Sequence, residues 1–175
     1  MSAPVTVRPL RWSDFDDLRE NYFHLYEERA RGASIGISLF REKPTVAQEV
    51  EWFAQQFRQV TDGLAVGSVA EVDGRAVGSC FVAPRQPGSE LDHVGELGIL
   101  VHESHRGQGV GTALLTDALS QCRGRFDSVY LAVFATNEGA KRLYARFGFV
   151  LCGRLPRTIK RGAEFIDLEW MALRL

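Results

Sequence analysis

A glycine-rich hexapeptide, Arg106-Gly107-Gln108-Gly109-Val110-Gly111, has the residue types and spacing of an anion-binding turn. It follows an apolar segment that predicts a strand and opens a segment, Gly109–Cys122, whose apolar periodicity predicts a helix. The first amides of a helix lack partners within the helix, and the helix dipole is positive at that end. Glycines allow the backbone to approach an anion without interference from a Cβ atom. The sequence therefore predicts that this turn binds phosphate groups.

Two familiar phosphate-binding motifs fit this turn poorly. A Walker A loop requires Lys-Ser/Thr after its last glycine, whereas Thr112-Ala113 follow Gly111 here. A dinucleotide fingerprint requires G-x-G-x-x-G, whereas the spacing here is G-x-G-x-G and the turn comes late in the chain. A glycine-rich turn that binds no ligand remains an alternative at this point.

Composition and charge exclude several classes of protein. The formal net charge of −1 argues against a general nucleic-acid-binding protein. The three cysteines are widely spaced and form no C-x-x-C pair, so they predict neither disulfides nor a zinc site. The Met1–Pro4 segment has no signal-peptide pattern, and no apolar run reaches the roughly 18–20 residues that cross a bilayer. We therefore expect a cytoplasmic protein that needs no metal and binds neither nucleic acid nor membrane.

The elements that must position the turn alternate between strand and helix signals, which predicts one mixed α/β domain over residues 1–175. A meander of strands comes first, with a tight hairpin at Asp73-Gly74, and strand–helix–strand units follow. The predicted strands are Val5–Arg8, Leu64–Val72, Arg75–Val82, Leu91–Val101, Ser128–Phe134, Phe149–Cys152 and Phe165–Leu173.

Four helices are expected to flank this sheet. Capping-box spacing marks the start of the first two, at Ser13 and at Thr45. The third helix begins at the glycine-rich turn. The fourth, Glu138–Phe147, is followed by Gly148, which suits a left-handed helix cap.

Two segments of the chain resemble motifs of the GNAT superfamily of N-acetyltransferases. After the strand Glu96–Val101, the motif A signature Q/R-x-x-G-x-G/A is filled by Arg106, Gly109 and Gly111. The segment Asn137–Phe149 fills motif B, N-x-x-A-x-x-x-Y-x-x-x-G-F, without a gap. The first strand and helix also match the family's usual start. The resemblance implies a GNAT-like acyl-CoA N-acyltransferase fold, with a central, mostly antiparallel sheet flanked by helices.

The resemblance also implies where acetyl-CoA would bind. Backbone groups of Ile99, Leu100 and Val101 would pair with the pantetheine arm in the manner of a strand. The amides of the turn would hold the pyrophosphate with the Arg106 side chain nearby, and Asn137 would bond to the pantetheine. The expected cofactor-binding residues are Ile99, Leu100, Val101, Arg106, Gly107, Gln108, Gly109, Val110, Gly111, Thr112, Asn137, Ala140 and Tyr144.

Acyl transfer to an amine requires a neutral nucleophile, a stabilised oxyanion and a protonated leaving thiolate. An alkylammonium with a pKa of roughly 10.4 leaves about one molecule in a thousand neutral near pH 7, so a base accelerates the reaction. The resemblance makes Glu96 the candidate base and Tyr144 the candidate acid, with an amide near Leu100 polarising the thioester carbonyl. An ion-paired Glu96 and a Tyr144 buried in the core remain alternatives. Transfer would be direct, because no cysteine stands where the family would need a nucleophile.

Two connections are expected to border the acceptor. Arg29–Lys43 is a long segment rich in apolar residues, and Gly153–Glu164 carries four basic residues that would attract an acidic peptide or a substrate carboxylate, or are simply solvated. Glu27 and Glu28 would attract a cationic amine or lie on an exposed helix face. The expected acceptor is a primary amine of a protein or a small molecule, and a homodimer is an open possibility. The alternative function is that of a non-catalytic acyl-CoA-binding sensor or regulatory module.

Overall fold

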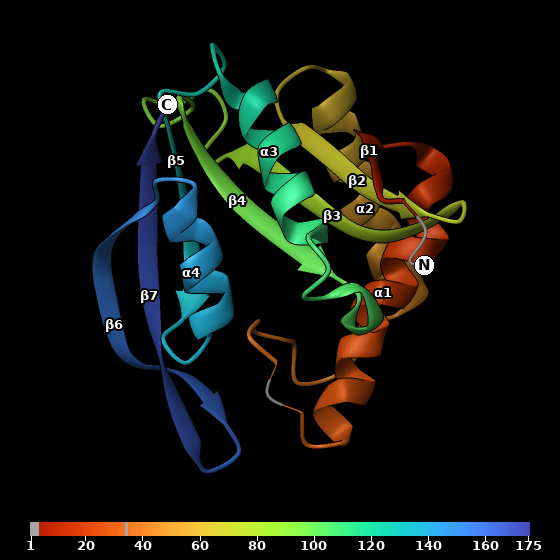
Figure 1. The fold of residues 1–175 in the computed structure, drawn as a ribbon, viewed down its shortest axis with the longest axis vertical. Coiled ribbons are helices and arrows are strands. Elements are labelled where there is room, and N and C mark those ends of the chain that lie inside the picture. The colour runs from red at the N-terminus through yellow and green to blue at the C-terminus, as the bar shows by residue number, and fades with distance from the viewer. Residues whose placement is uncertain (1–3, 34) are drawn as a thin grey trace.

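The computed structural model describes residues 4–33 and 35–175, which form a seven-stranded sheet with helices on both faces (Figure 1). The strand order is β1-β2-β3-β4-β5-β7-β6. All neighbouring strands are antiparallel except β4 and β5, which are parallel. The expected mixed, mostly antiparallel sheet is thus confirmed. The strands are β1 (Thr6–Pro9), β2 (Val66–Val72), β3 (Arg75–Pro84), β4 (Val94–Val101), β5 (Ser128–Phe134), β6 (Val150–Arg161) and β7 (Glu164–Arg174).

Two helices cover each face of the sheet (Figure 1). Helices α1 and α2 lie on one face, and α3 and α4 lie on the other. Within the described ranges, no helix is both long enough and apolar enough to cross a bilayer. The helices are α1 (Phe15–Ala30), α2 (Val46–Thr61), α3 (Val110–Cys122) and α4 (Glu138–Arg146), and short 3-10 turns, η1 (Trp12–Asp14) and η2 (Glu103–His105), precede α1 and α3.

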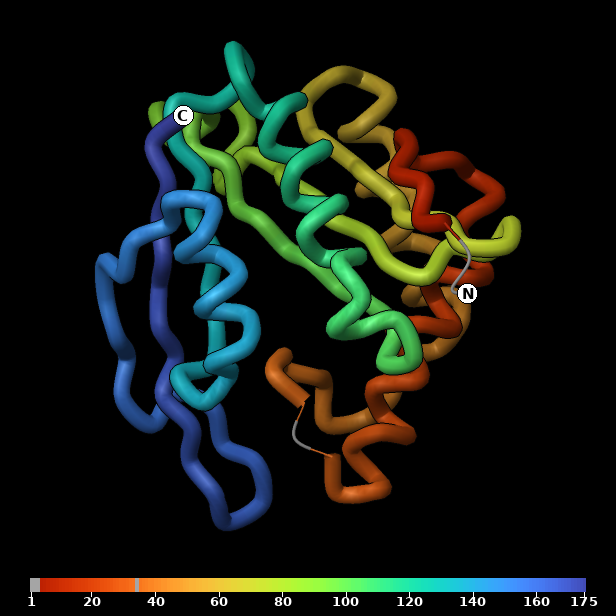
Figure 2. The backbone as a smooth tube through the Cα atoms, viewed as in Figure 1, coloured from red at the N-terminus to blue at the C-terminus, as the bar shows by residue number. Residues whose placement is uncertain are grey.

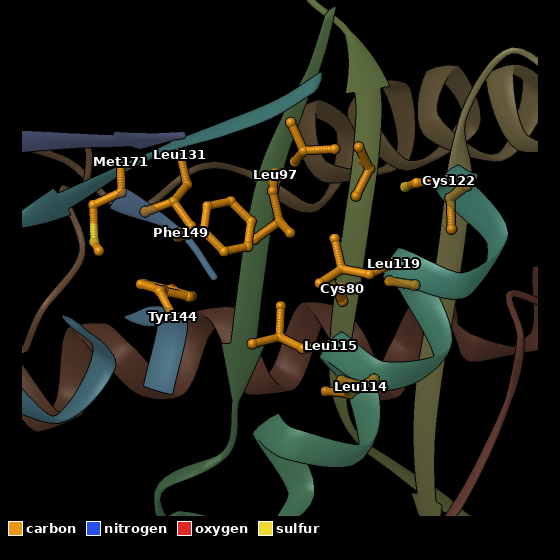
Figure 3. Packing of buried hydrophobic residues seen from close by; sticks show 14 of the residues in the cluster. Cys80, Leu97, Leu114, Leu115, Leu119, Cys122, Leu131, Tyr144, Phe149 and Met171 are labelled. Atoms are coloured by element: carbon orange, nitrogen blue, oxygen red, sulfur yellow. The ribbon is translucent and has the colours of Figure 1, made fainter. Parts of the chain in front are cut away.

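Each face of the sheet has its own hydrophobic core. The larger core lies under α3 and α4, where Leu97 of β4, Leu115 of α3 and Leu131 of β5 are buried together (Figure 3). The smaller core, under α1 and α2, is built around Phe53, whose ring meets that of Phe15 edge to face. Burying one such side chain stabilises the fold by roughly 1.5–3 kcal/mol. Both helix pairs are therefore anchored firmly to the central strands.

Strands β4 and β5 pair over only part of their length. Their register runs from Val94 opposite Ser128 to Glu96 opposite Tyr130. Beyond this point β4 pairs only with β3, β5 pairs only with β7, and the two strands diverge (Figure 1). We call the resulting break in the sheet the β4–β5 gap. One side of it is the unpaired edge of β4.

The connection Gly153–Glu164, which the sequence predicts to be a loop, is mostly strand. Strand β6 continues to Arg161, and a tight turn at Gly162 leads directly into β7. A bulge between Leu155 and Ile159 breaks the register of the two strands. Such a bulge also interrupts the alternation of apolar and polar residues by which a strand is recognised. The prediction was wrong for this reason.

The start of α1 also differs from its prediction. Ser13, expected to cap the helix, lies inside η1. The carboxylate of Asp14 instead accepts a hydrogen bond from the amide of Arg11 (2.7 Å) and pairs with the Arg8 guanidinium (2.7 Å). The second expected cap is confirmed, since Oγ1 of Thr45 accepts a hydrogen bond from an amide in the first turn of α2 (3.3 Å).

Candidate active site

Hydrogen bonds between β3 and β4 fix the direction of each backbone group on β4. The amide of His102 donates to the carbonyl of Val77 on β3 (2.9 Å). Antiparallel partners exchange hydrogen bonds at every second residue, so Leu100 also bonds to β3. Ile99 and Val101 therefore direct their amides and carbonyls into the β4–β5 gap. The sequence predicts that the backbone groups of all three residues pair with pantetheine. The structure corrects this prediction for Leu100, because its backbone groups face away from the gap.

The glycine-rich turn lies at the end of this open edge. Gly107 and Gly109 adopt φ values of +74° and +86°, and a Cβ atom on either would meet no other atom within 4 Å. The first hydrogen bond of α3 joins the amide of Ala113 to the carbonyl of Gly109, so the preceding amides of the helix have no partner within it. The first turn carries no acidic residue, and Val110, 1% exposed, anchors it in the core. The turn therefore presents bare backbone donors and a positive dipole, as its sequence predicts.

Gly111 has a packing role that the sequence does not reveal. A Cβ atom at this position would lie 3.2 Å from Cδ2 of Leu143 on α4. The missing side chain therefore lets α3 and α4 approach each other beside the gap. Its amide still belongs to the free first turn of α3.

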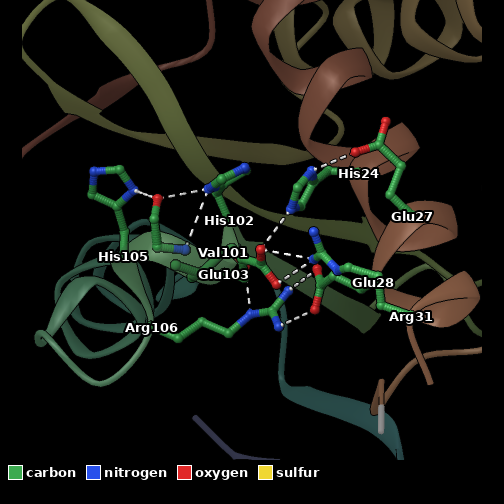
Figure 4. A network of polar contacts seen from close by, with 10 residues as sticks. His24, Glu27, Glu28, Arg31, Val101, His102, Glu103, His105 and Arg106 are labelled. Atoms are coloured by element: carbon green, nitrogen blue, oxygen red, sulfur yellow. Dashed lines mark hydrogen bonds and ion pairs between the residues drawn. The ribbon is translucent and has the colours of Figure 1, made fainter. Parts of the chain in front are cut away.

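The side chain of Arg106 is held by an ion pair with α1. Its two terminal nitrogens donate to the carboxylate of Glu28 at 2.6 and 2.8 Å, and its Nε donates to the carbonyl of Val101 at 2.9 Å (Figure 4). The Glu28 side chain is only 3% exposed, which corrects the idea that it attracts an amine or lies on an exposed helix face. Arg106 thus ties the turn to both α1 and the open edge of β4.

A more exposed set of ion pairs surrounds this contact. Glu103 accepts hydrogen bonds from His24 (2.9 Å) and Arg31 (2.8 Å), and chiefly the His24 contact lowers the pKa of its carboxyl (Figure 4). Ligand atoms of His24, Glu28 and Glu103 lie within 4.8 Å of one another, as metal ligands do. Each of the two carboxylates already pairs with an arginine, so ion pairing accounts for this cluster.

Tyr144 and Asn137 stand at opposite ends of α4. The Tyr144 ring, 7% exposed, packs against Phe149 at a centroid distance of 5.9 Å (Figure 3). Burial raises the pKa of its hydroxyl, which forms no hydrogen bond with any described residue. Asn137 caps α4, since its Oδ1 accepts a hydrogen bond from the amide of Ala140 (3.2 Å). The Asn137 Nδ2 group is not used in this cap.

Glu96 lies at the last paired position of β4 before the gap. Its side chain is half exposed, accepts a hydrogen bond from the Tyr130 hydroxyl (2.5 Å) and lies 3.6 Å from the Arg85 guanidinium. Neighbouring strand residues point to opposite faces, so Glu96 faces away from Leu97, which lies in the core beside Tyr144. The predicted base and acid thus lie on opposite faces of the sheet. Glu96 is also ion-paired, as its alternative interpretation holds.

The segment between α1 and α2 crosses the wide end of the gap (Figure 2). The Arg161 guanidinium donates to the carbonyls of Ile35 and Ile37, both at 3.0 Å, and Ile35 is 2% exposed. Gly36 lies against Asn137, because a Cβ atom at residue 36 would fall 1.9 Å from its Nδ2 atom. This loop therefore covers the residue expected to bind pantetheine. The sequence anticipates a packed loop but not these partners, which are more than a hundred residues away.

Comparisons with known proteins show the family to which this fold belongs. The model of the acetyltransferase (GNAT) family matches residues 13–149. The L-amino acid N-acetyltransferase AaaT of Escherichia coli is 31% identical over 106 residues, which cover 59% of this chain and 65% of that protein. The L-methionine sulfoximine/L-methionine sulfone acetyltransferase of Pseudomonas paraeruginosa is 24% identical over 140 residues, or 79% and 80% of the two chains. The structure of yncA from Salmonella typhimurium, solved with its cofactor acetyl-CoA, superimposes with a TM-score of 0.82 at 19% identity, over 97% of this chain and 93% of that one.

Proposed function

Because the chain belongs to the acetyltransferase (GNAT) family, we propose that it is an acetyl-CoA-dependent enzyme that transfers acetyl directly to a primary amine of a small acceptor. One observation carries the proposal: the open edge of β4 ends at Val101, and the chain then leads through η2 and the glycine-rich turn to the free amides at the start of α3. An extended arm with amide groups suits the first feature, and a pyrophosphate suits the second. The two features follow each other in the order that a pantetheine diphosphate requires.

The residues of the gap fit this co-substrate in detail. Ile99 offers a donor and an acceptor to an extended arm, and Val101, whose carbonyl already accepts from Nε of Arg106, offers its amide as a donor. The Nδ2 group of Asn137, which lies against Gly36 of the loop, is the further donor of this proposal. The amides of Val110, Gly111 and Thr112 have no partner within α3, so they are available to phosphate oxygens. Bound acetyl-CoA supplies an activated thioester.

The protein's own groups then perform three tasks. The Ile99 amide, which faces the gap, stabilises negative charge on the carbonyl oxygen. The Tyr144 hydroxyl gives its proton to the leaving sulfur, and the raised pKa of this buried phenol keeps it protonated beforehand. Glu96 accepts a proton from the incoming ammonium, directly or through water. The Tyr130 hydroxyl donates a hydrogen bond to its carboxylate (2.5 Å), and the Arg85 guanidinium lies 3.6 Å from it.

Two of the relatives, and the loop, support a small acceptor. The two curated relatives described above are named for amino acids or amino-acid derivatives. The loop at Ile35–Ile37, held down by Arg161, narrows the approach to the gap. A compact amine passes such an opening more easily than a folded protein does.

The proposal is tested by thermal unfolding with acetyl-CoA, beside ATP and NAD, followed by assays of thiol release. A ligand that binds only the folded state at about 100 times its Kd adds about 2.7 kcal/mol of stability. We expect acetyl-CoA alone to raise the Tm, and free CoA to appear when amino acids are added. No shift with acetyl-CoA would refute the proposal. Binding without thiol release over a broad panel of amines would instead indicate an acyl-CoA sensor.

A further inference from the structure

A groove with four basic residues lies between the loop after α1 and the tip of the β6–β7 hairpin. Figure 2 shows that this loop and the hairpin tip lie at the same end of the molecule. Its volume is about 510 Å³, within the range of small-molecule sites. The other residues that line it are uncharged, and none is acidic. We call it the basic groove and define it by its charged residues, Arg29, Arg41, Lys160 and Arg161.

The cations of the basic groove have no ion-pair partner in the described chain, although the negative charge of Glu164 acts on Arg161 from a greater distance. Within residues 4–33 and 35–175, none of its four cations forms an ion pair with a carboxylate. Arg154, on the same strand as Arg161, does so with Asp167 at 2.7 Å. Burial, and next the charge of Arg29, lower the pKa of Arg161. Like charges crowded around an uncharged hollow favour the binding of an anion.

The arginines are positioned by backbone contacts that leave donors free. Arg161 uses one N–H on each terminal nitrogen for the carbonyls of Ile35 and Ile37. Arg29 reaches the carbonyls of Phe40 and Arg41 at 3.4 Å in the same way. A guanidinium has five N–H donors, so each retains several. Planar forks of this kind match carboxylate and phosphate oxygens.

The basic groove adjoins the reaction site. The Arg161 guanidinium lies over the ring of Phe134, the last residue of β5, at 5.4 Å from its centroid. Gly36, between the two residues whose carbonyls Arg161 holds, touches Asn137 at the mouth of the β4–β5 gap. A molecule that places an anionic group in the basic groove can therefore extend toward the gap.

We propose that the basic groove binds an anionic group of the acceptor, so that the preferred acceptor is a small amine bearing a carboxylate or a phosphate-type group. This proposal rests on the proposed function and assigns its substrate class. The charge pattern gives the selectivity, because an uncharged amine would leave the four cations repelling one another.

The test compares three acceptors with the same amine: an amino acid, its uncharged amide, which has nearly the same shape, and the corresponding amino phosphonate, which is anionic but tetrahedral. The variant R41Q/K160Q removes two exposed cations but keeps the arginines that hold the loop. The matched control is R123Q, which removes the charge of an exposed arginine far from the groove. We expect the double variant to lower kcat/KM for the anionic acceptors by about tenfold or more and for the amide by less than about twofold. The KM for acetyl-CoA should not change.

Equal losses for charged and neutral acceptors would overturn the proposal, as would a loss confined to acetyl-CoA, which would assign the groove to the cofactor. Both results leave the proposed acetyl transfer intact. A second measurement needs no turnover: the rise in Tm caused by inorganic phosphate, in wild type and in each variant. The proposal requires a smaller rise in R41Q/K160Q than in R123Q, and equal rises refute it.

Discussion

Arg106 of the glycine-rich turn and Glu28 of α1, 78 residues apart in the chain, share two hydrogen bonds within one ion pair. The contact joins α1, the helix before the loop at Ile35–Ile37, to the glycine-rich turn that we propose binds the pyrophosphate. Its two partners differ in environment, since the Glu28 side chain is 3% exposed and the Arg106 side chain is 41% exposed.

This asymmetry predicts unequal costs for the two single substitutions. Arg106→Gln strands a buried carboxylate, so we expect it to destabilise the fold by about 2 kcal/mol, less than a fully buried pair because Arg106 is partly exposed. Glu28→Gln leaves the arginine in contact with water and should cost about 1 kcal/mol. Urea unfolding measures both, with Arg31→Gln as an exposed control expected to cost under about 1 kcal/mol. Equal losses in all three variants would contradict the asymmetry.

Two substitutions at Gly109 separate the effect of negative charge from the effect of backbone strain at the turn. Its φ of +86° strains any other residue, so Gly109→Ala and Gly109→Glu should lose stability alike. Only the glutamate places a negative charge beside the expected pyrophosphate. We expect Glu to weaken acetyl-CoA binding at least about tenfold more than Ala does, measured by calorimetric titration. The same Kd in both variants would remove the turn from the phosphate site.

Tyr144→Phe tests the proposed acid. We expect kcat to fall by about a hundredfold, while the Kd for acetyl-CoA changes by less than about twofold. Stability should change by under about 1 kcal/mol, because the hydroxyl has no hydrogen-bond partner among the described residues. Burial raises the pKa of Tyr144, so the wild-type kcat should not decline through loss of this proton below pH 10. An unchanged kcat would exclude Tyr144 as the acid.

Glu49 of α2 should make the stability of the fold depend on pH. The residue is 8% exposed, its carboxylate forms no hydrogen bond or ion pair within the described chain, and burial raises its pKa. Because the pKa of Glu49 is raised in the folded state, folding favours its protonated form. Its contribution to the free energy of unfolding is therefore greatest at acid pH and is lost as the pH rises through the folded pKa. Glu49→Gln should therefore be more stable than wild type at pH 7, and the difference should shrink toward pH 4. Urea unfolding at pH 7 and pH 4 tests this prediction, with Glu51→Gln at an exposed position as the control. A difference in the free energy of unfolding that is the same at both pH values would contradict it.

Local features of the fold were predictable from the sequence, and contacts between distant segments were not. Asp73 and Gly74 form the expected hairpin with φ values of +50° and +76°, and Thr45 caps α2 as its spacing predicts. Each depends on residues a few positions apart, so the local sequence determines it. The length of β6 was missed because a bulge hides its alternation.

The same distinction between local features and long-range contacts applies to the candidate site. The turn was recognisable because glycine spacing and a helix start occur together in the sequence. Nothing near Glu28 reveals that it is buried, because its partner comes from another element. Similarly, the sequence shows that Arg161 is basic. Its hydrogen bond to the carbonyl of Ile35 forms only because the β6–β7 hairpin packs against the loop after α1. The alternation that turns Leu100 away from the gap depends on its register with β3.

The register between β3 and β4 also determines how fast the amide hydrogens of β4 exchange with water. The amide of Leu100 is bonded within the sheet, while the amides of Ile99 and Val101 on either side of it face the gap. Three consecutive residues of one strand should thus exchange their amide hydrogens with deuterated water at different rates, slowly at the centre and quickly on both sides. A molecule that fills the gap as an added strand would slow the two outer residues and leave the middle one as it was.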